Sequence, residues 1–147
     1  MTQEAIEHPK HYTYHPSGVE AIEICELIGF NCGCAFKYLF RRNSKHEDPT
    51  TDLRKALWYV RRELSFMNAG AISVSALLEP LVGDYSGNFF SLCFAEVEEK
   101  MLKILEIEDS FVAGAMAHLV RGYELQDEGD LAVAAHYIER EIAKHAR

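Results

Sequence analysis

The sequence has no apolar run long enough to cross a membrane, no phosphate-binding loop and no C-x-x-C pair. A membrane span needs about 18 or more consecutive apolar residues, and the polar start MTQEAIEHPK does not resemble a signal peptide. None of the nine glycines precedes a lysine, which excludes the G-x-x-x-x-G-K-[ST] loop. These absences predict a cytoplasmic protein with no membrane partner, in which any nucleotide chemistry runs without that loop.

Cysteine is also scarce, with four residues in the chain. Cys25 and Cys93 lie in apolar patterns with helical spacing, and Cys32-Gly33-Cys34 is a C-x-C, which is neither a redox nor a zinc motif. We therefore expect buried free thiols that behave as small apolar residues.

Positive charge is concentrated in one stretch, residues 33–64, which we call the basic segment. It holds eight of the fifteen Lys and Arg residues and four acids, so it carries +4 in a chain of net charge −8. An acidic protein with one basic segment does not suit extended nucleic acid, but the segment can hold a small polyanion such as a nucleotide phosphate. The alternative is that its charges are the solvated faces of two amphipathic helices.

Apolar residues recur at helical spacing and nowhere alternate convincingly, so the predicted fold is all-α, a bundle of about six to seven helices. Helices are expected at 19–28, 31–42, 52–64, 75–81, 89–107, 110–123 and from 130 onward, with loops at 8–18, 43–51 and 83–88. A strand at 71–74 is the alternative to loop there. The expected N-terminal caps are Ser17, Asn31, Asp52, Ser110 and Asp130.

The two halves look related. Residues 52–64 (DLRKALWYVRREL) and 130–142 (DLAVAAHYIEREI) are identical at six of thirteen aligned positions. Upstream of them, Phe30-x-x-Gly33 aligns with Phe111-x-x-Gly114. This predicts two pseudo-repeated helical hairpins, in a family-like half at 1–69 with a basic groove and a degenerate half at 70–147 that shares its core. The alternative is a match of amphipathic pattern alone.

The aligned residues differ in charge. The second half has His118 where the first has Lys37, and Gly122 where the first has Arg41. Lys55 likewise aligns with Val133. The contrast predicts that only the first half binds an anionic ligand.

Within the basic segment, Lys37 and Arg41 share a helix face, and Lys45 follows just past the helix end. Asp52, Lys55, Tyr59 and Arg62 share a face of the next helix, with Trp58 beside it. An antiparallel hairpin would bring these faces into a groove of cations and aromatic rings. Such a cluster suffices in principle for phosphoryl transfer, with a ring as a stacking surface for a base.

Two groups of residues are candidate ligands for a metal ion. His8, His11 and His15 form an H-x-x-H pattern without a paired carboxylate, and the alternative is that imidazole and Tyr12 line the groove. Glu20, Glu23 and Glu26 share a helix face that suits Mg²⁺ or solvent. We expect no metal ligands among the site residues and no required cofactor. Whether Mg²⁺ takes part is not decided by the sequence.

Four ordered blocks resemble a small phage family that includes the P-loop-lacking nucleotide kinase of T-odd coliphages. The blocks begin with His8-Pro-x-His11-Tyr12 and continue with Gly18-x-Glu20-x-Ile22, Phe30-x-x-Gly33-x-Ala35-x-Lys37-Tyr38-Leu39-x-Arg41 and Asp52-Leu53-x-Lys55-Ala56-x-x-Tyr59. The resemblance implies phosphorylation of deoxynucleoside monophosphates by a triphosphate donor, a dispensable metal ion, a homo-oligomer and the cytoplasm of a host cell.

Three functions therefore remain. The first is a P-loop-free nucleoside monophosphate kinase. The second is an all-α, Mg²⁺-dependent nucleoside triphosphate pyrophosphatase, for which Glu20-x-x-Glu23 and Glu106-x-x-Asp109 offer carboxylates. The third is a non-enzymatic phage protein that captures a nucleotide or a host protein. For the kinase, the expected catalytic residues are His11, Lys37 and Arg41, and the expected substrate-binding residues are His8, Tyr12, Arg42, Lys45, Lys55, Trp58 and Tyr59.

Overall fold

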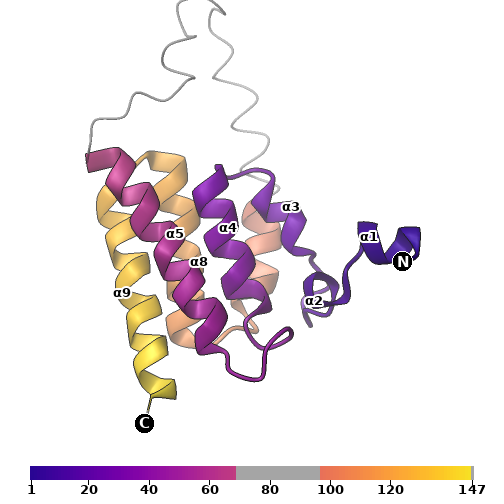
Figure 1. Ribbon diagram of the computed structural model, residues 1–147. Coiled ribbons are helices and arrows are strands. Elements are labelled where there is room, and N and C mark those ends of the chain that lie inside the picture. Colours follow the sequence, from indigo (N-terminus) through magenta and orange to yellow (C-terminus); the bar gives the residue numbers. More distant parts are fainter. Residues whose placement is uncertain (69–96, 147) are drawn as a thin grey trace, which may run out of the picture.

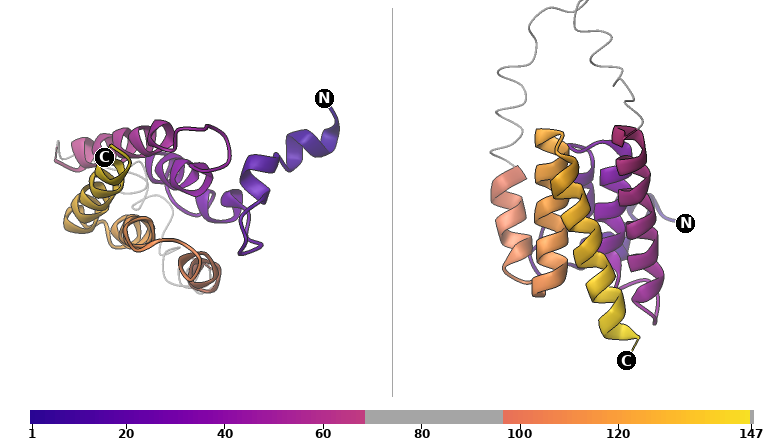
Figure 2. Two further views of the ribbon diagram at one scale, coloured as in Figure 1. Left: turned by 90° about the horizontal axis from the view of Figure 1, so that it is seen from below. Right: turned by 90° about the vertical axis from the view of Figure 1, so that its left-hand side faces the viewer.

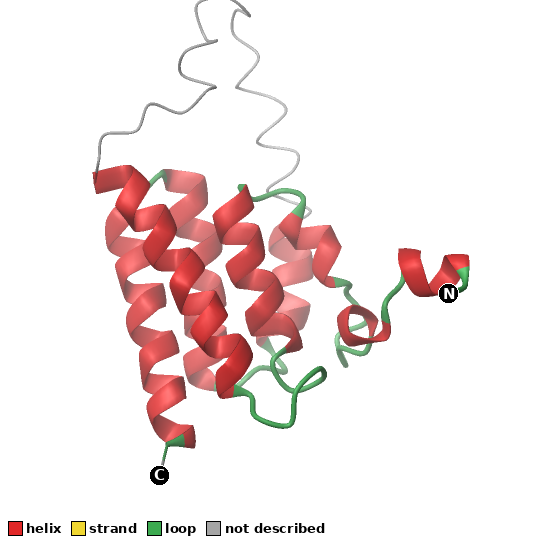
Figure 3. Ribbon diagram, viewed as in Figure 1, coloured by secondary structure: helices red, strands yellow, loops and turns green. Residues whose placement is uncertain are grey.

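The computed structural model describes residues 1–68 and 97–146 of the chain (Figure 1). In these two ranges the regular elements are helices and no strand occurs, as the all-α prediction requires (Figure 3). The expected short helix at 75–81, the alternative strand at 71–74, the loop at 83–88 and Cys93 lie outside the described residues.

Four long helices form the body of the protein. They are α4 (Phe30–Arg41), α5 (Thr50–Asn68), α8 (Ser110–Leu125) and α9 (Glu128–His145). α4 packs on α5, α5 on α9, α9 on α8, and α8 on α4, so the contacts close into a four-helix bundle (Figure 2). The helical residues 97–105 lie beside α8.

One apolar core joins residues from both halves of the chain, including Leu39, Val60, Leu119 and Ile138. The predicted stripes supply much of it: Leu53, Ala56 and Val60 on α5 are fully buried because they recur on one helix face. On the helical residues 97–105, Val97, Met101 and Ile104 are buried as expected, whereas the earlier positions of that stripe are not described.

The N-terminal arm, residues 8–18, was expected to be a loop, and that expectation was wrong in part because α2 (Lys10–Thr13) is a short helix within it. α1 (Gln3–Glu7) precedes the arm, and α3 (Ala21–Cys25) is shorter than the helix expected at 19–28. Such short segments lack a periodic apolar stripe, so periodicity alone misses them. α1 and α2 lie at one side of the bundle, with α2 nearer to α3 and α1 farther out (Figure 1).

The helix caps also differ from those expected. Glu20 and Glu23 form a capping box at α3, and Gly29 precedes α4 without a side-chain cap. The side chains that accept the first free N–H groups of α5, α8 and α9 are those of Asp48, Asp109 and Asp127. Ser17, Asn31, Asp52, Ser110 and Asp130 are therefore not the caps, because another residue already fills each position. Asp52 and Asp130 are left to bind cations.

Candidate functional site

The site centres on an ion pair between Arg41, at the end of α4, and Asp52, in the first turn of α5. Arg41 Nε donates to Asp52 Oδ2 at 3.2 Å and Arg41 Nη2 donates to Oδ1 at 3.3 Å. Asp52 is fully buried and Arg41 is 5% exposed. A two-pronged contact of this kind fixes the guanidinium plane, so the pair holds the two helix ends in one relative position.

Tyr12 extends this pair to the N-terminal arm. Arg41 Nη1 donates to the Tyr12 hydroxyl at 2.6 Å, and the guanidinium lies 5.4 Å from the centre of the Tyr12 ring. The contact fastens α2 to the bundle. The hydrogen bonds of Arg41 go to Asp52 and Tyr12. The main role of Arg41 is therefore to position these neighbours and not to bind a ligand directly.

Three cations surround the ring of Tyr38. Arg41 lies 4.7 Å, Lys37 Nζ 4.8 Å and Lys55 Nζ 5.4 Å from the ring centre, each near enough for a cation–π contact. We call Lys37, Tyr38, Arg41, Asp52 and Lys55 the Tyr38 cluster.

The Tyr38 cluster carries more positive than negative charge. Lys55 shares the Asp52 carboxylate with Arg41, at 3.4 Å. Lys37 forms no ion pair within the described residues. Three cations thus face one buried carboxylate, which leaves a surplus of two positive charges at a partly exposed surface. An anionic ligand would neutralise this surplus.

Exposed aromatic rings continue the cluster along the surface. The Tyr59 ring stacks on Tyr38 at 5.8 Å and also meets the edges of Trp58 at 4.9 Å and Phe30 at 6.2 Å. Trp58 is 58% and Phe30 77% exposed. Large exposed rings beside cations suit the stacking of a nucleobase.

His11 lies on the other side of Tyr12, where the two rings are 4.2 Å apart. The Ser44 hydroxyl donates to the His11 carbonyl oxygen at 3.2 Å, which ties α2 to the loop after α4. Burial lowers the pKa of His11 below its ordinary 6.5, and the charges of Lys45 and Arg41 lower it further against the opposing charge of Asp52. The imidazole is therefore neutral near pH 7 and able to accept a proton.

His46 joins the site although the sequence patterns did not single it out. Its Nε2 atom lies 3.8 Å from Asp52 Oδ1 and is buried without a hydrogen-bond partner in the described part of the chain. His46 could have been predicted from its place in the loop that joins the two charged helices, α4 and α5. Asp52 was expected on the same helix face as Lys55 and also as a helix cap; it is the ion-pair partner of Arg41 and not the cap.

Two expected site residues lie elsewhere. His8 Nδ1 bonds to Glu20 at 3.0 Å, and this hydrogen bond raises the pKa of His8. Arg42 turns away from Arg41: it donates to the Leu39 carbonyl and, at 2.7 Å, to Glu108. Arg42 is 6% exposed, so its role is to neutralise a buried carboxylate. Lys45 is exposed and lies near enough to act on His11.

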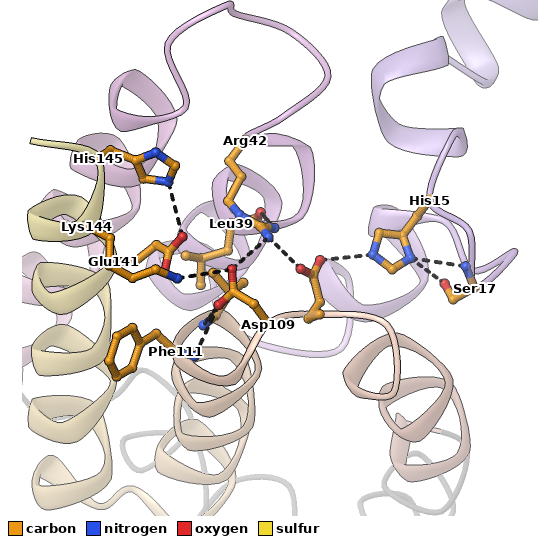
Figure 4. Close-up of polar contacts among 11 residues, drawn as sticks. His15, Ser17, Leu39, Arg42, Asp109, Phe111, Glu141, Lys144 and His145 are labelled. Carbon is orange, nitrogen blue, oxygen red and sulfur yellow. Dashed lines mark hydrogen bonds and ion pairs between the residues drawn. The ribbon is translucent and has the colours of Figure 1, made fainter. Parts of the chain in front are cut away.

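Glu108 and its partners form a second polar cluster, shown in Figure 4, which links the arm, α4, α8 and α9. The Ser17 backbone N–H donates to His15 Nδ1 at 3.3 Å, so Nε2 carries the proton that is donated to Glu108 at 3.0 Å. Burial raises the pKa of Glu108, but the hydrogen bonds from His15 and Arg42 outweigh burial and leave the pKa below 4.5. Asp109 extends the contacts to Lys144 at 3.8 Å.

The second hairpin, α8 and α9, also holds a buried aspartate, with a different set of cations. Asp130 accepts hydrogen bonds from His118 at 2.7 Å and from Arg121 at 2.8 Å, and these bonds lower its pKa. The His118 ring stacks on Tyr137 at 5.8 Å. In the described residues the cations of this hairpin lie over a different ring: Arg140 and Lys144 Nζ are 5.3 and 5.4 Å from the centre of Phe111.

Residues 1–68 and 97–146 hold no group of three or more His, Cys, Asp or Glu side chains arranged for a metal ion. In the same ranges, no helix is both long and apolar enough to span a membrane. Cys25 and Cys32 are free thiols whose pKa is raised by burial to about 12, as expected of inert core residues.

Comparison with known proteins gives one result. Residues 6–61 match the model of a protein family described only as of unknown function, DUF3310. The match spans both the arm and the whole Tyr38 cluster, but less than half of the chain. No curated protein and no solved structure matches.

Proposed function

We propose that this chain is a P-loop-free nucleoside monophosphate kinase of phage nucleotide metabolism, which uses a nucleoside triphosphate as donor. The observation that carries the proposal is the charge surplus of the Tyr38 cluster, where three cations surround the Tyr38 ring, two of them pair with one buried carboxylate, and exposed aromatic rings lie beside them. Phosphoryl transfer depends mostly on positioning and on neutralising charge spread over phosphate oxygens. A fixed cluster of cations supplies both.

Each residue has a role in this proposal. Lys37 and Lys55 bind phosphate oxygens, because their ammonium groups are partly exposed. Arg41 holds the site in shape through Asp52 and Tyr12 and adds its charge to the field. Neutral His11 exchanges a proton or a hydrogen bond with a phosphate, and Trp58 offers a face to a base.

In this proposal the second hairpin, α8 and α9, is a copy of the first that keeps its helix packing but lacks the ligand-binding cations of the Tyr38 cluster. Recurrent ring contacts support it: Phe30 meets Tyr59 at 6.2 Å and the aligned Phe111 meets Tyr137 at 6.1 Å. We further propose a homo-oligomer in the host cytoplasm, with Mg²⁺ modulating the reaction without being required.

The carboxylates favour this function over a pyrophosphatase. That activity needs free acidic pairs to hold Mg²⁺, whereas Glu20 binds His8 and Glu23 binds Lys100 at 2.9 Å. Asp109 caps α8. A protein that captures a nucleotide without turnover would use the same cations, so only a reaction distinguishes it from a kinase.

The test is to incubate the purified protein with panels of nucleoside monophosphates and triphosphates, with and without Mg²⁺, and to separate products by ion-exchange chromatography. A diphosphate formed from a monophosphate only when a triphosphate is present is the expected result. Pyrophosphate released from a triphosphate alone would contradict it and favour the pyrophosphatase. Binding without any product would favour the non-enzymatic protein.

A further inference from the structure

One face of α5 extends the Tyr38 cluster along the surface of the protein. Its residues lie three or four positions apart, so their side chains form one line along the helix: Lys55, Tyr59, Arg62 and Phe66. We call these four residues the α5 stripe. Arg62 and Phe66 are exposed, and the function proposed above gives neither of them a role.

Cations and aromatic rings alternate along the α5 stripe. At its start, Lys55 Nζ lies 5.4 Å from the centre of the Tyr38 ring, and Tyr59 stacks on the same ring at 5.8 Å. Farther along, the Arg62 guanidinium lies 4.8 Å from the centre of the Phe66 ring. A second pair of a cation and a ring therefore follows the first along the helix.

The α5 stripe is longer than one nucleotide requires. Phe66 follows Lys55 by eleven residues, which corresponds to about 16 Å along the helix axis. A stacked single strand carries one phosphate per about 3.4 Å, so the stripe spans roughly four to five nucleotides of such a strand. A mononucleotide bound at the Tyr38 cluster would leave Arg62 and Phe66 uncovered.

The charges on this face suit a polyanion. Across residues 1–68 and 97–146, neither Lys37 nor Arg62 is paired with a carboxylate, and Lys55 shares Asp52 with Arg41. The negative charge of Glu63, beside the stripe, is held at α4 by a hydrogen bond from Asn31 at 2.8 Å. Because the chain as a whole carries −8, a long strand would be repelled elsewhere on the surface, so the ligand is short.

The rings on this face favour a polyanion that carries bases. Phe66 is 44% exposed, and Trp58, beside the stripe, is 58% exposed. Aromatic rings beside cations bind single strands with little regard to sequence, since every base has a face that can stack. An acidic peptide would match the charges but would leave these rings without a stacking partner.

We propose that the α5 stripe, together with Lys37 and Trp58, binds a short single strand of nucleic acid of about four nucleotides. One nucleotide of the strand occupies the Tyr38 cluster, and the following ones continue over Arg62 and Phe66. This inference rests on one part of the proposed function, nucleotide binding at the Tyr38 cluster, and does not require phosphoryl transfer.

Trp58 provides a direct measurement, because it is the single tryptophan of the chain and lies beside the stripe. Its fluorescence is recorded while the protein is titrated with thymidine monophosphate and with oligothymidylates of two, four and eight nucleotides. Stacking of bases should quench it. The affinity should rise at least about tenfold from the monophosphate to the tetranucleotide and then level off, because the stripe ends at Phe66.

Two variants shorten the stripe. Arg62→Ala and Phe66→Ala should each weaken the tetranucleotide at least about fivefold and leave the affinity for the monophosphate within about twofold. Arg62→Ala should also reduce the slope of log affinity against log salt concentration by about 0.7, the value for one phosphate contact with a single strand.

Arg140→Ala is the matched control. Arg140 aligns with Arg62, is exposed, and likewise lies over a phenylalanine ring, 5.3 Å from the centre of Phe111. Its replacement removes the same charge from the chain and should change neither affinity. Circular dichroism and a urea unfolding midpoint establish that each variant is folded.

The outcomes separate this inference from the kinase. If the tetranucleotide binds no more tightly than the monophosphate, or if Arg140→Ala weakens it as much as Arg62→Ala, the stripe does not bind a strand and the kinase stands. Equally tight binding of tetraglutamate would overturn the inference in favour of an acidic protein partner. Tetranucleotide binding without monophosphate binding would support the stripe and count against the kinase, and binding of neither would contradict both.

Discussion

The hairpin of α4 and α5 and the hairpin of α8 and α9 each hold a buried aspartate, but they surround it with different cations. In α4 and α5, buried Asp52 binds Arg41 and Lys55, and lysines stand around the Tyr38 ring. In α8 and α9, buried Asp130 binds His118 and Arg121 instead. Asp52 and Tyr59 recur as Asp130 and Tyr137, whereas the aligned positions of Lys37, Tyr38 and Lys55 hold His118, Leu119 and Val133.

This difference separates what a hairpin needs to fold from what the first hairpin has in addition. An aspartate in the first turn, paired with a cation of the preceding helix, joins the two helices in both places. The lysines of the first hairpin are not needed for that purpose, since the second hairpin folds without them. In our proposal, the surplus lysines at a partly exposed surface are the residues that bind the ligand.

The largest effect is expected from unpairing the buried charge. Asp52→Asn leaves Arg41 buried without its counter-charge, which should lower the free energy of unfolding by about 3–5 kcal/mol. Asp130→Asn should cost clearly less, because the Arg121 side chain is 61% exposed and regains water. Urea unfolding of both variants measures the difference. Equal losses would remove the distinction between the two aspartates.

A smaller effect is expected from removing one phosphate-binding lysine. Lys37→Ala or Lys55→Met should weaken binding of a non-hydrolysable triphosphate by about 1–3 kcal/mol, the scale of a charged hydrogen bond. His118→Ala, at the position aligned with Lys37, should leave the affinity unchanged. Isothermal titration calorimetry provides the values, and similar losses at His118 and Lys37 would mean that both hairpins bind.

Arg41→Ala is less informative about binding, although Arg41 was expected to be catalytic. Removing it leaves Asp52 buried with one partly exposed lysine as its ion-pair partner, so folding and binding would change together. The lysine variants avoid this difficulty.

The Glu108 cluster connects the hairpins and should make stability depend on acid. The pKa of Glu108 is lowered in the folded protein, so its contribution is present above the ordinary value of 4.5 and is lost as pH falls through the folded value. The difference in unfolding free energy between wild type and Glu108→Gln should be constant near neutrality and shrink below about pH 4.5. Denaturant unfolding at a series of pH values measures it. A difference that grows in acid would reverse the assigned sign.

The smallest effect is expected where the hairpins meet at the surface. Arg61 Nη2 donates to Glu139, at the position aligned with Arg61, over 2.5 Å. The two side chains are 61% and 46% exposed, so Arg61→Ala should cost at most about 1 kcal/mol. The cost should vanish in 1 M salt because screening weakens exposed pairs. A salt-independent loss above that size would show that the contact acts through packing.

The sequence predicts the long helices and their buried faces well, because a repeated apolar stripe such as Leu53, Ala56 and Val60 specifies a helix and its buried face. The sequence also predicts that Lys37, Arg41 and Lys55 lie close together, because a short loop joins their two helices. It does not predict the partners of Asp52, because an aspartate near a helix start suits both a cap and an ion pair. Which role it takes depends on whether Asp48 already fills the cap.

The same limit explains the errors at Arg42 and in the arm. Arg41 and Arg42 are neighbours in sequence, but successive helical residues point about 100° apart. One therefore meets Asp52 and the other meets Glu108, far along the chain. α2 is a single turn held by the contacts of Tyr12 and His11, and such contacts leave no periodic signal.

We propose that nucleotides bind to the first hairpin and not to the second. A nuclear magnetic resonance titration of ¹⁵N-labelled protein with a monophosphate and a non-hydrolysable triphosphate tests this directly. The largest amide shifts are expected at His11, Lys37, Tyr38 and Lys55, while the amide signals of His118 and Tyr137 should stay unchanged. Shifts of equal size in α8 and α9, or no shifts at millimolar nucleotide, would contradict it.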